Sequence, residues 1–244
     1  MSARFATHLL AGTVLAASLP ATASSQSARD TTANHVVDKL SVTILSSNLA
    51  NGATIGEWGL SALVQADGQC VLFDAGRHPD TVLRNAEALD VDLSCVTDVV
   101  LSHFHFDHTT GLLPIVRAVR DTNPGAIRRV HVAKGFFLPR RSLAAGDDTE
   151  WNQMIAMQEA FAELDVAFVE HDGPTEIFPG VWVTGPIDRP HPEHNYPNTI
   201  RVQLDGAWVE DHVPDSQALS VMTPDGHVVL LGCGHSGVVN ALDQ

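Results

Sequence analysis

The most chemically informative part of the chain is a run of potential metal ligands near its middle. His103, His105, Asp107 and His108 directly follow the apolar segment 98–101. Imidazole and carboxylate groups suit Zn²⁺ and neighbouring divalent ions. Because His103 and His105 are two residues apart, their side chains can point to the same side, and a turn after them can bring Asp107 and His108 to that side as well. We therefore expect a metal site at a strand end, rather than a solvated histidine-rich loop.

The elements that must position this run alternate between short β-rich segments and helical ones. This alternation predicts an α/β or α+β layered domain rather than an all-β one. The expected strands are 41–45, 60–65, 70–73, 98–101, 129–132, 166–169, 181–184, 200–204, 218–222 and 227–231, and the expected helices are 79–89, 112–120 and 149–164. Asp67-Gly68 and Asp225-Gly226 lie between apolar segments. Glycine accepts positive φ without steric cost, so both pairs predict hairpins and therefore mixed sheets.

The segment 185–198 has a different character, because it contains four prolines. Proline has no backbone N–H and a fixed φ, so a regular helix or strand is excluded there. We expect a surface loop over another part of the molecule. His191 and His194 from this loop are possible residues of the cleft wall, although isolated histidines are more often structural.

The run His-x-His-x-Asp-His after a hydrophobic strand resembles the signature of the metallo-β-lactamase-fold hydrolases. The segment 71–76 (Val-Leu-Phe-Asp-Ala-Gly) resembles the strand with Asp-x-Gly that precedes that signature in the family. More narrowly, the segments 57–61, 181–185, 215–219 and 231–240 resemble a subgroup labelled dihydropterin-ribofuranosyl-aminobenzene-phosphate synthases. The resemblance covers most of the mature chain, and it implies an αββα sandwich with one or two metal ions in a cleft between the sheet edges.

The resemblance also implies a role for each residue of the candidate site. His103 and His105 would hold a first ion together with His235, while Asp107 and His108 would hold a second. The ions would be Zn²⁺, with Fe or Mn as alternatives, because imidazole and carboxylate groups bind each of these metals.

The roles of Asp74 and of the cysteines stay open at this point. Asp74 is either an acceptor for the free N–H of a ligand histidine or an ordinary turn residue. Cys233 is either a soft metal ligand or a small buried residue, and we favour the second interpretation. Cys70 and Cys95 could pair in an oxidising compartment, but we favour two separate buried thiols.

The chemistry that these residues imply is metal-assisted hydrolysis. A metal lowers the pKa of its bound water from about 15.7 to about 7, and the resulting hydroxide attacks a carbonyl or phosphoryl centre. Asp107 would be the catalytic residue that orients this hydroxide. We expect an exported metal-dependent hydrolase of a small-molecule ester, lactone, amide or phosphoester. The alternatives are a pterin-pathway phosphate synthase-like transferase or phosphoesterase, and an inactive metal-binding remnant.

Composition disfavours several other classes of function. The chain has 29 acidic and 14 basic residues, a net charge of −15, and only 6% aromatic residues. A non-specific grip on nucleic acid or anionic lipid is therefore disfavoured, as is a platform for stacking bases. We expect a small-molecule substrate, no nucleic-acid partner and no membrane attachment after signal cleavage, whereas the oligomeric state is not indicated.

The two ends of the chain carry further expectations. Arg4, the apolar run 9–19 and an Ala-Thr-Ala site at 21–23 predict a signal peptide at residues 1–23. We expect a tether at 24–39, a metallo-β-lactamase-like domain at 40–244 and a periplasmic or secreted mature protein. Members of the resembled subgroup usually continue past the Gly-Cys-x-His segment, so the resemblance implies either a fold that is truncated at the C-terminus or a site that a partner completes.

Overall fold

The computed structural model describes residues 35–144, 149–196 and 198–244. The predicted signal peptide at 1–23 and most of the predicted tether lie outside the described residues. All elements below belong to the unit formed by residues 34–244. No helix within the described ranges is both long and apolar enough to cross a membrane.

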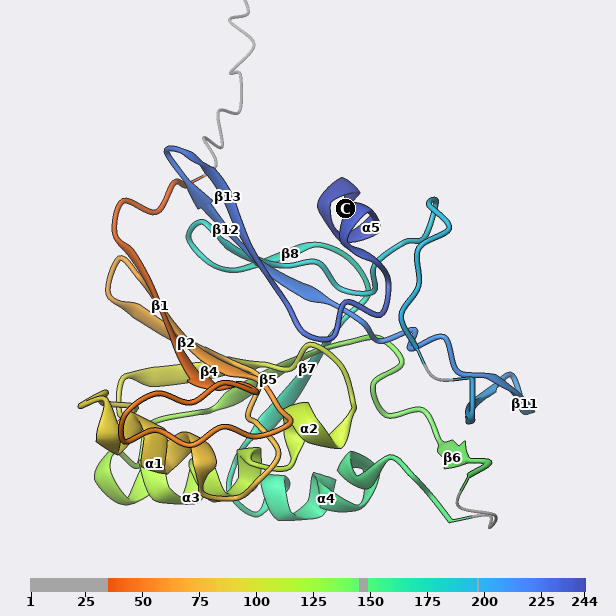
Figure 1. Ribbon diagram of the computed structural model, residues 1–244, viewed down its shortest axis with the longest axis horizontal. Helices are drawn as coiled ribbons and strands as arrows, with labels where there is room; N and C mark the ends of the chain where they lie inside the picture. The colour runs from red at the N-terminus through yellow and green to blue at the C-terminus, as the bar shows by residue number, and fades with distance from the viewer. Residues whose placement is uncertain (1–34, 145–148, 197) are drawn as a thin grey trace, which may run out of the picture. The chain divides into compact units, whose positions relative to one another are not determined.

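A six-stranded mixed sheet is built from strands between residues 40 and 171 (Figure 1). Its strands, in sheet order, are β1 (Leu40–Ser46), β2 (Ser61–Ala66), β3 (Gln69–Phe73), β4 (Val96–Val100), β5 (Arg129–Ala133) and β7 (Ala167–His171). The first three pair antiparallel, and β3, β4, β5 and β7 pair parallel. The β2–β3 hairpin turns at Asp67 and Gly68, which have φ values of 47° and 87°, so the predicted turn is confirmed.

Helices cover one face of this sheet, because parallel strands need crossover connections. These helices are α1 (Thr81–Ala88), α3 (Leu112–Thr122) and α4 (Gln153–Ala162), and the short α2 (Phe106–Thr109) lies between β4 and α3. The strand alternation sorts side chains between two cores. Val99 packs with Ile115 and Phe161 of the helices, whereas Val100 faces the second sheet.

The second sheet has four antiparallel strands and lies on the other face of the first. In sheet order it contains β13 (Gly226–Leu231), β12 (Ala218–Thr223), β9 (Val181–Val183) and β8 (Thr175–Phe178). Phe73 and Val100 of the first sheet share a buried apolar cluster with Val181 and Leu219 of the second. The short α5 (Val238–Asp243) packs on the second sheet through Ala241. The layers therefore form the expected αββα sandwich (Figure 1).

Every predicted strand and helix is present within a few residues of its predicted bounds. The structure adds α2, α5, β8 and a small three-stranded sheet of order β11-β10-β6, formed by β11 (Ala207–Glu210), β10 (Ile200–Leu204) and β6 (Arg140–Ser142). All four residues of β11 are exposed. The sequence does not predict β6 or β11, because a strand of three or four residues carries too little alternation to be recognised.

Cys70 and Cys95 form a disulfide, so the expectation of two separate thiols is wrong. Cys70 pairs in register with Val96 of the parallel neighbour strand, directly after Cys95. The two Cα atoms are 5.7 Å apart, a separation that a disulfide spans without backbone movement. The strand order β3-β4 brings the two cysteines together, and spacing along the chain does not specify that order.

Candidate metal centre

Three imidazole nitrogens face one another at the end of β4. The Nε2 atom of His103 lies 2.9 Å from Nδ1 of His105, and Nε2 of His235 lies 3.1 Å from both. All three residues are at most 8% exposed. Ligands about 2.0–2.1 Å from a tetrahedral Zn²⁺ lie about 3.3 Å from one another. The structure thus brings the three residues of the expected first ion to the mutual spacing that one ion requires.

Hydrogen bonds to the Nδ1 atoms of His103 and His235 leave their Nε2 atoms unprotonated and facing each other. Ser102 Oγ donates to Asp74 Oδ2 (2.7 Å), so it accepts from Nδ1 of His103 (2.9 Å). Nδ1 of His235 donates to the Asn195 carbonyl. In the neutral rings the two Nε2 atoms are then both acceptors. Two acceptors this close repel each other unless a cation lies between them, so the donor set fits a metal ion.

Burial determines the charge of this group. Burial, together with the charges of the neighbouring histidines, lowers the pKa of His103 well below its usual value and that of His105 to about 3. Both rings are therefore neutral at pH 7, the form in which imidazole binds metal. Nε2 of His105 is buried without a hydrogen-bond partner among the described residues.

A second group of potential ligands lies beside the first. Nε2 of His108 is 3.4 Å from Asp107 Oδ2 and 3.2 Å from Cys233 Sγ. The ligand atoms of these three residues all lie within 4.8 Å of one another, and the same limit holds for His103, Cys233 and His235. Cys233 is only partly buried, and its Sγ belongs to both groups. The alternative that we favoured less, a metal-ligand role, is therefore the better supported one.

Asp74 supports His108 from behind. It is fully buried at the end of β3, where its φ is 56°. Its Oδ2 lies 2.6 Å from Nδ1 of His108, and its Oδ1 accepts the backbone N–H of Ser102 at 2.7 Å. The carboxylate thereby fixes the ring so that Nε2 faces Asp107 and Cys233. Asp74 has both features that the sequence left open: it is a turn residue and an acceptor for a candidate ligand.

Contacts within the second group shift the pKa values of His108, Asp107 and Cys233. Burial by itself lowers the pKa of His108, but the negative charge of Asp74 and its hydrogen bonds outweigh burial and raise it well above the usual value. Burial raises the pKa of Asp107, yet hydrogen bonding to His108 outweighs this effect and lowers it. The pKa of the Cys233 thiol is likewise lowered, because hydrogen bonds to His108 and His235 outweigh burial. The shifts of Asp107 and Cys233 favour the carboxylate and thiolate forms that bind metal, whereas the raised pKa of His108 means that this ring must release a proton when an ion binds.

Glycines let the strand ends approach this closely. A Cβ atom at Gly232 would overlap Ser102 Oγ, and Gly234 has a φ of 66°. These glycines flank Cys233, and they allow the end of β13 to pack against the segment that follows β4.

The proline-rich loop does reach the site, but not through its histidines. His191 Nε2 lies 2.5 Å from the carboxylate of Asp243 on α5, and His194 is exposed beside Tyr196. Asn195 makes the contact instead, because its carbonyl accepts from His235 and its Nδ2 donates to the Cys233 carbonyl at 3.0 Å. Nothing in the residue types distinguishes this asparagine in the sequence.

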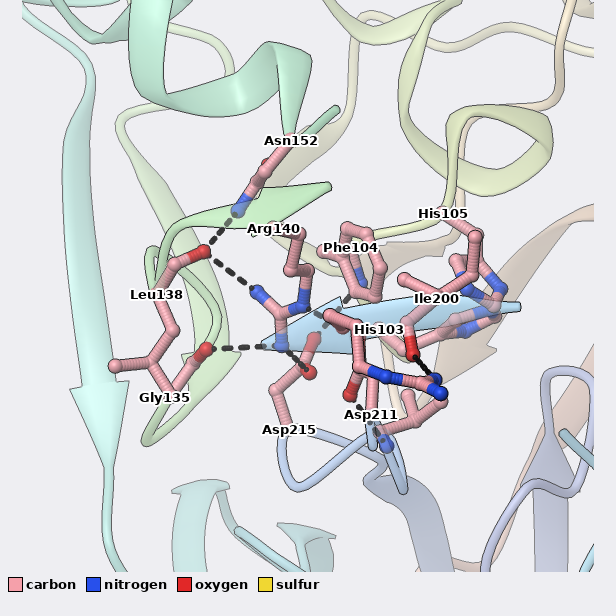
Figure 2. A network of polar contacts seen from close by, with 12 residues as sticks. His103, Phe104, His105, Gly135, Leu138, Arg140, Asn152, Ile200, Asp211 and Asp215 are labelled. Atoms are coloured by element: carbon pink, nitrogen blue, oxygen red, sulfur yellow. Dashed lines mark hydrogen bonds and ion pairs between the residues drawn. The ribbon is translucent and has the colours of Figure 1, made fainter. Parts of the chain in front are cut away.

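The loop that carries His103 and His105 is also tied to the segment before β12 (Figure 2). The N–H of Phe104 donates to Asp215 Oδ2 at 2.8 Å. Gln217 Nε2 donates to the carbonyl of Leu101 at 2.8 Å, and its backbone N–H donates to the Ser102 carbonyl at 2.9 Å. Sequence reasoning did not find these anchors, because each contact spans more than a hundred residues.

A cavity opens beside the second group. It has a volume of about 340 Å³, and Asp107, His108 and Cys233 form part of its wall. A larger cavity of about 450 Å³, lined by Trp182 and Leu242 among others, contains none of the candidate ligands. The smaller cavity is therefore the one in which a substrate could meet a bound ion.

Comparisons with known proteins agree with this geometry. The family described as the Metallo-beta-lactamase superfamily matches residues 59–234. A 7,8-dihydropterin-6-methyl-4-(beta-D-ribofuranosyl)-aminobenzene-5'-phosphate synthase of Methanocaldococcus jannaschii is 25% identical over 218 residues, which are 85% of this chain and 72% of that protein. An uncharacterized protein of the same organism is 27% identical over 208 residues, 83% of this chain and 72% of that protein. The crystal structure of Tm1679, a metal-dependent hydrolase of the beta-lactamase superfamily, matches with a TM-score of 0.60 and 27% identity, over 82% of this chain and 68% of that one.

Proposed function

Since this chain belongs to the metallo-beta-lactamase superfamily, whose fold supports a metal-dependent hydrolase, we propose that it hydrolyses an ester, lactone, amide or phosphoester bond of a small molecule. One observation carries the proposal: the Nε2 atoms of His103 and His235 face each other at 3.1 Å with both protons directed away. That arrangement is stable only around a cation. It lies next to a cavity of suitable size for a small substrate.

The residues divide into two sets of three donors. His103, His105 and His235 would hold one ion, and Asp107, His108 and Cys233 would hold a second. Imidazole and carboxylate groups suit Zn²⁺, Fe or Mn, and a thiolate favours Zn²⁺ among these. Such an ion, when bound, polarises a scissile carbonyl or phosphoryl group and lowers the pKa of water to about 7.

The protein's own side chains provide orientation. Asp107 is 6% exposed and borders the cavity, so its carboxylate would orient the attacking water. Asp74 and Asn195 accept the outer N–H groups of His108 and His235. These two acceptors hold the rings in one orientation before a substrate enters.

A second candidate function is that of a synthase-like transferase or phosphoesterase. The similarity to the Methanocaldococcus jannaschii synthase, 25% identity over 85% of this chain, favours it. It requires a phosphorylated substrate, whereas the first proposal also includes esters, lactones and amides.

The deciding experiment is a substrate panel run beside metal analysis. Purified protein is loaded with Zn²⁺, Fe or Mn, its metal content is measured by mass spectrometry, and neutral esters, lactones, amides, phosphomonoesters and phosphodiesters are offered. Turnover that is lost in Asp107→Asn and after chelation is expected. Bound metal without turnover of any compound would indicate the inactive remnant instead.

We also propose that the mature protein works in the periplasm or outside the cell. The signal-peptide pattern at 1–23 supports this location, and so does the Cys70–Cys95 disulfide, because disulfides persist in oxidising compartments. N-terminal sequencing of protein recovered from a secreting host is expected to begin near Ser24. An intact Met1 on soluble cytoplasmic protein would refute the location.

A further inference from the structure

The cavity beside the candidate metal site has an apolar wall. Besides the potential ligands, its lining includes Leu49, Trp58 and Leu60. Leu49 is 83% exposed and Trp58 is 64% exposed. Covering large apolar side chains with a ligand removes apolar surface from water, which is favourable, and an indole offers a flat face for packing. This wall therefore favours a ligand with an apolar group.

The loop that carries Trp58 is held in place on both sides. The buried carboxylate of Glu57 accepts the Ser46 hydroxyl at 2.6 Å and two backbone N–H groups at 3.0 and 2.9 Å. On the other side, a Cβ at Gly59 would lie 2.8 Å from the carbonyl of Asp107, so only glycine allows this approach. The indole is thus exposed on a rigid support next to a candidate ligand, as expected for a preformed binding wall.

The charge of the wall distinguishes between substrate classes. None of the described residues that line the cavity is Lys or Arg, and the whole chain carries a net charge of −15. Sites that recognise phosphate normally supply Arg, Lys or a cluster of N–H donors. Apart from His108 and a bound ion, the described lining residues offer an anionic substrate no cationic partner.

We infer that the substrate is an uncharged ester or lactone whose apolar acyl or aryl group packs against Trp58 and Leu49. This inference rests on the proposed function and narrows it to carboxylic esters. It disfavours the phosphorylated substrate of the synthase-like alternative.

The test compares p-nitrophenyl acetate, butyrate and hexanoate in the metal-loaded wild type, Trp58→Ala and Trp58→Phe. We expect kcat/KM of the wild type to rise by about threefold per added methylene until the wall is covered. In Trp58→Ala, the preference for hexanoate over acetate should fall at least about fivefold. Trp58→Phe should retain most of the preference, and Trp208→Ala, on the remote β11, should retain all of it.

A binding measurement separates this inference from the proposed function. 4-Nitrophenyl butyl ether lacks a scissile carbonyl, and its nitroaryl group quenches tryptophan emission. It should bind the wild type at least about fivefold more tightly than Trp58→Ala, whether or not any ester is hydrolysed. Equal affinities, an unchanged chain-length preference in Trp58→Ala, or faster turnover of bis-p-nitrophenyl phosphate than of every ester would overturn the inference. Ether binding without hydrolysis of any compound would leave the apolar binding wall standing, and it would refute the proposed hydrolase and with it the ester or lactone substrate.

An independent observation concerns a buried arginine behind the imidazoles (Figure 2). Arg140 is 0% exposed. Its Nε donates to Asp211 at 2.9 Å, its Nη2 to Asp215 at 2.5 Å, and the remaining bonds go to the carbonyls of Gly135, Phe136 and Leu138 at 3.0–3.2 Å. All five N–H groups of the guanidinium thus have acceptors.

This arginine contacts the metal-ligand loop in two ways. Its guanidinium lies 3.7 Å from the ring centroid of Phe104. Its partner Asp215 accepts the backbone N–H of the same residue. Phe104 lies between His103 and His105, so both its backbone and its side chain are fixed by one charge network. Two imidazoles on a loop need such support to keep the geometry of a metal site.

We infer that Arg140 and Asp215 are positioning residues for His103 and His105. In Asp215→Asn, the side chain keeps an acceptor for Phe104 but loses the charge that orients the arginine. We expect the Zn²⁺ dissociation constant, measured against a chromophoric chelator, to rise about 10- to 100-fold, with a changed visible spectrum of the Co²⁺ form.

The matched control is Asp98→Asn. Asp98 is as deeply buried as Asp215 and pairs with Arg129 and His131, and within the described part of the chain its carboxylate forms no hydrogen bond or ion pair with His103, Phe104 or His105. Its Zn²⁺ affinity should stay within about twofold of the wild type even if it melts earlier. If Asp215→Asn does not fold, Phe104→Leu, which removes the ring beneath the guanidinium, should weaken Zn²⁺ binding in the same direction. Wild-type affinity in the folded variants, or an equal loss in Asp98→Asn, would overturn the inference.

Discussion

The Nε2 atoms of His103 and His235 lie 3.1 Å apart although 132 residues separate them in the chain. His103 follows β4 of the six-stranded sheet, and His235 follows β13 of the four-stranded sheet. An ion between these two atoms would therefore connect the two sheets of the sandwich. Metal binding and the stability of the fold should be coupled as a consequence.

The first prediction concerns that coupling. Zn²⁺ should raise the melting temperature, because an ion that binds only the folded state at a hundred times its Kd adds about 2.7 kcal/mol to the free energy of unfolding. The double variant His103→Ala, His105→Ala should lose both the metal and this response to Zn²⁺. Metal analysis and calorimetry check the two effects. His227→Ala, at an exposed histidine of β13, is the control, and equal metal content in the double variant and the wild type would contradict the assignment.

The second prediction concerns the carboxylate behind His108. In Asp74→Asn, the acceptor of the Nδ1–H at 2.6 Å loses its charge, so the ring is held less firmly and its Nε2 is less basic. Loss of such a partner typically weakens metal binding about 10- to 100-fold. Competition titrations with a chelator would measure the change. Asp92→Asn, at an exposed aspartate whose carboxylate accepts hydrogen bonds from Ser94, should bind metal as the wild type does.

The sequence predicts the parts of this centre that are local in the chain. The His-x-His-x-Asp-His spacing places four candidate ligands in one turn after a strand, and the apolar runs predict that strand and its neighbours. The roles of Asn195, Asp215 and Gln217 could not be predicted, because each acts on residues 40 to 116 positions away. Such contacts depend on how the two sheets pack, and no local pattern specifies that packing.

The cysteines show the same difference between features that are local in the chain and contacts that depend on the fold. The spacing of Cys70 and Cys95 is compatible with both a disulfide and separate thiols, and only the parallel pairing of β3 with β4 decides between them. The surroundings of Cys233 are likewise only partly visible in the sequence. Its place next to His235 is visible in the sequence, but its approach to His108 across 125 positions is not.

The third prediction concerns the disulfide. It closes a loop with a sequence separation of 25 residues, which corresponds to about 3 kcal/mol of stabilisation in the chain-entropy description. Cys70→Ala with Cys95→Ala should lower the free energy of unfolding by about that amount, and a reductant should destabilise the wild type but not this variant. Denaturant titrations measure both effects. Zn²⁺ content should be unchanged, so a parallel loss of metal would show that the bond supports the site as well as the fold.

The last prediction concerns the acid side of the stability curve. Asp98 is fully buried, 2.5 Å from Nε of Arg129 and 2.8 Å from Nε2 of His131. Burial raises its pKa, but hydrogen bonds from His131 and Arg129 outweigh burial and lower the pKa to about 2. The folded pKa lies below the unfolded value of about 3.9, so the carboxylate stabilises the fold above about pH 4 and this contribution is lost as the pH falls towards 2. The contribution of the charged Asp98 to the free energy of unfolding is about 2 kcal/mol.

Asp98→Asn should therefore be less stable than the wild type by at least that amount between pH 5 and 7, and the difference should narrow between about pH 4 and pH 2. Urea denaturation of both proteins across this range measures the difference, and a gap that does not change with pH would show that the carboxylate is not held in its charged form by these two partners.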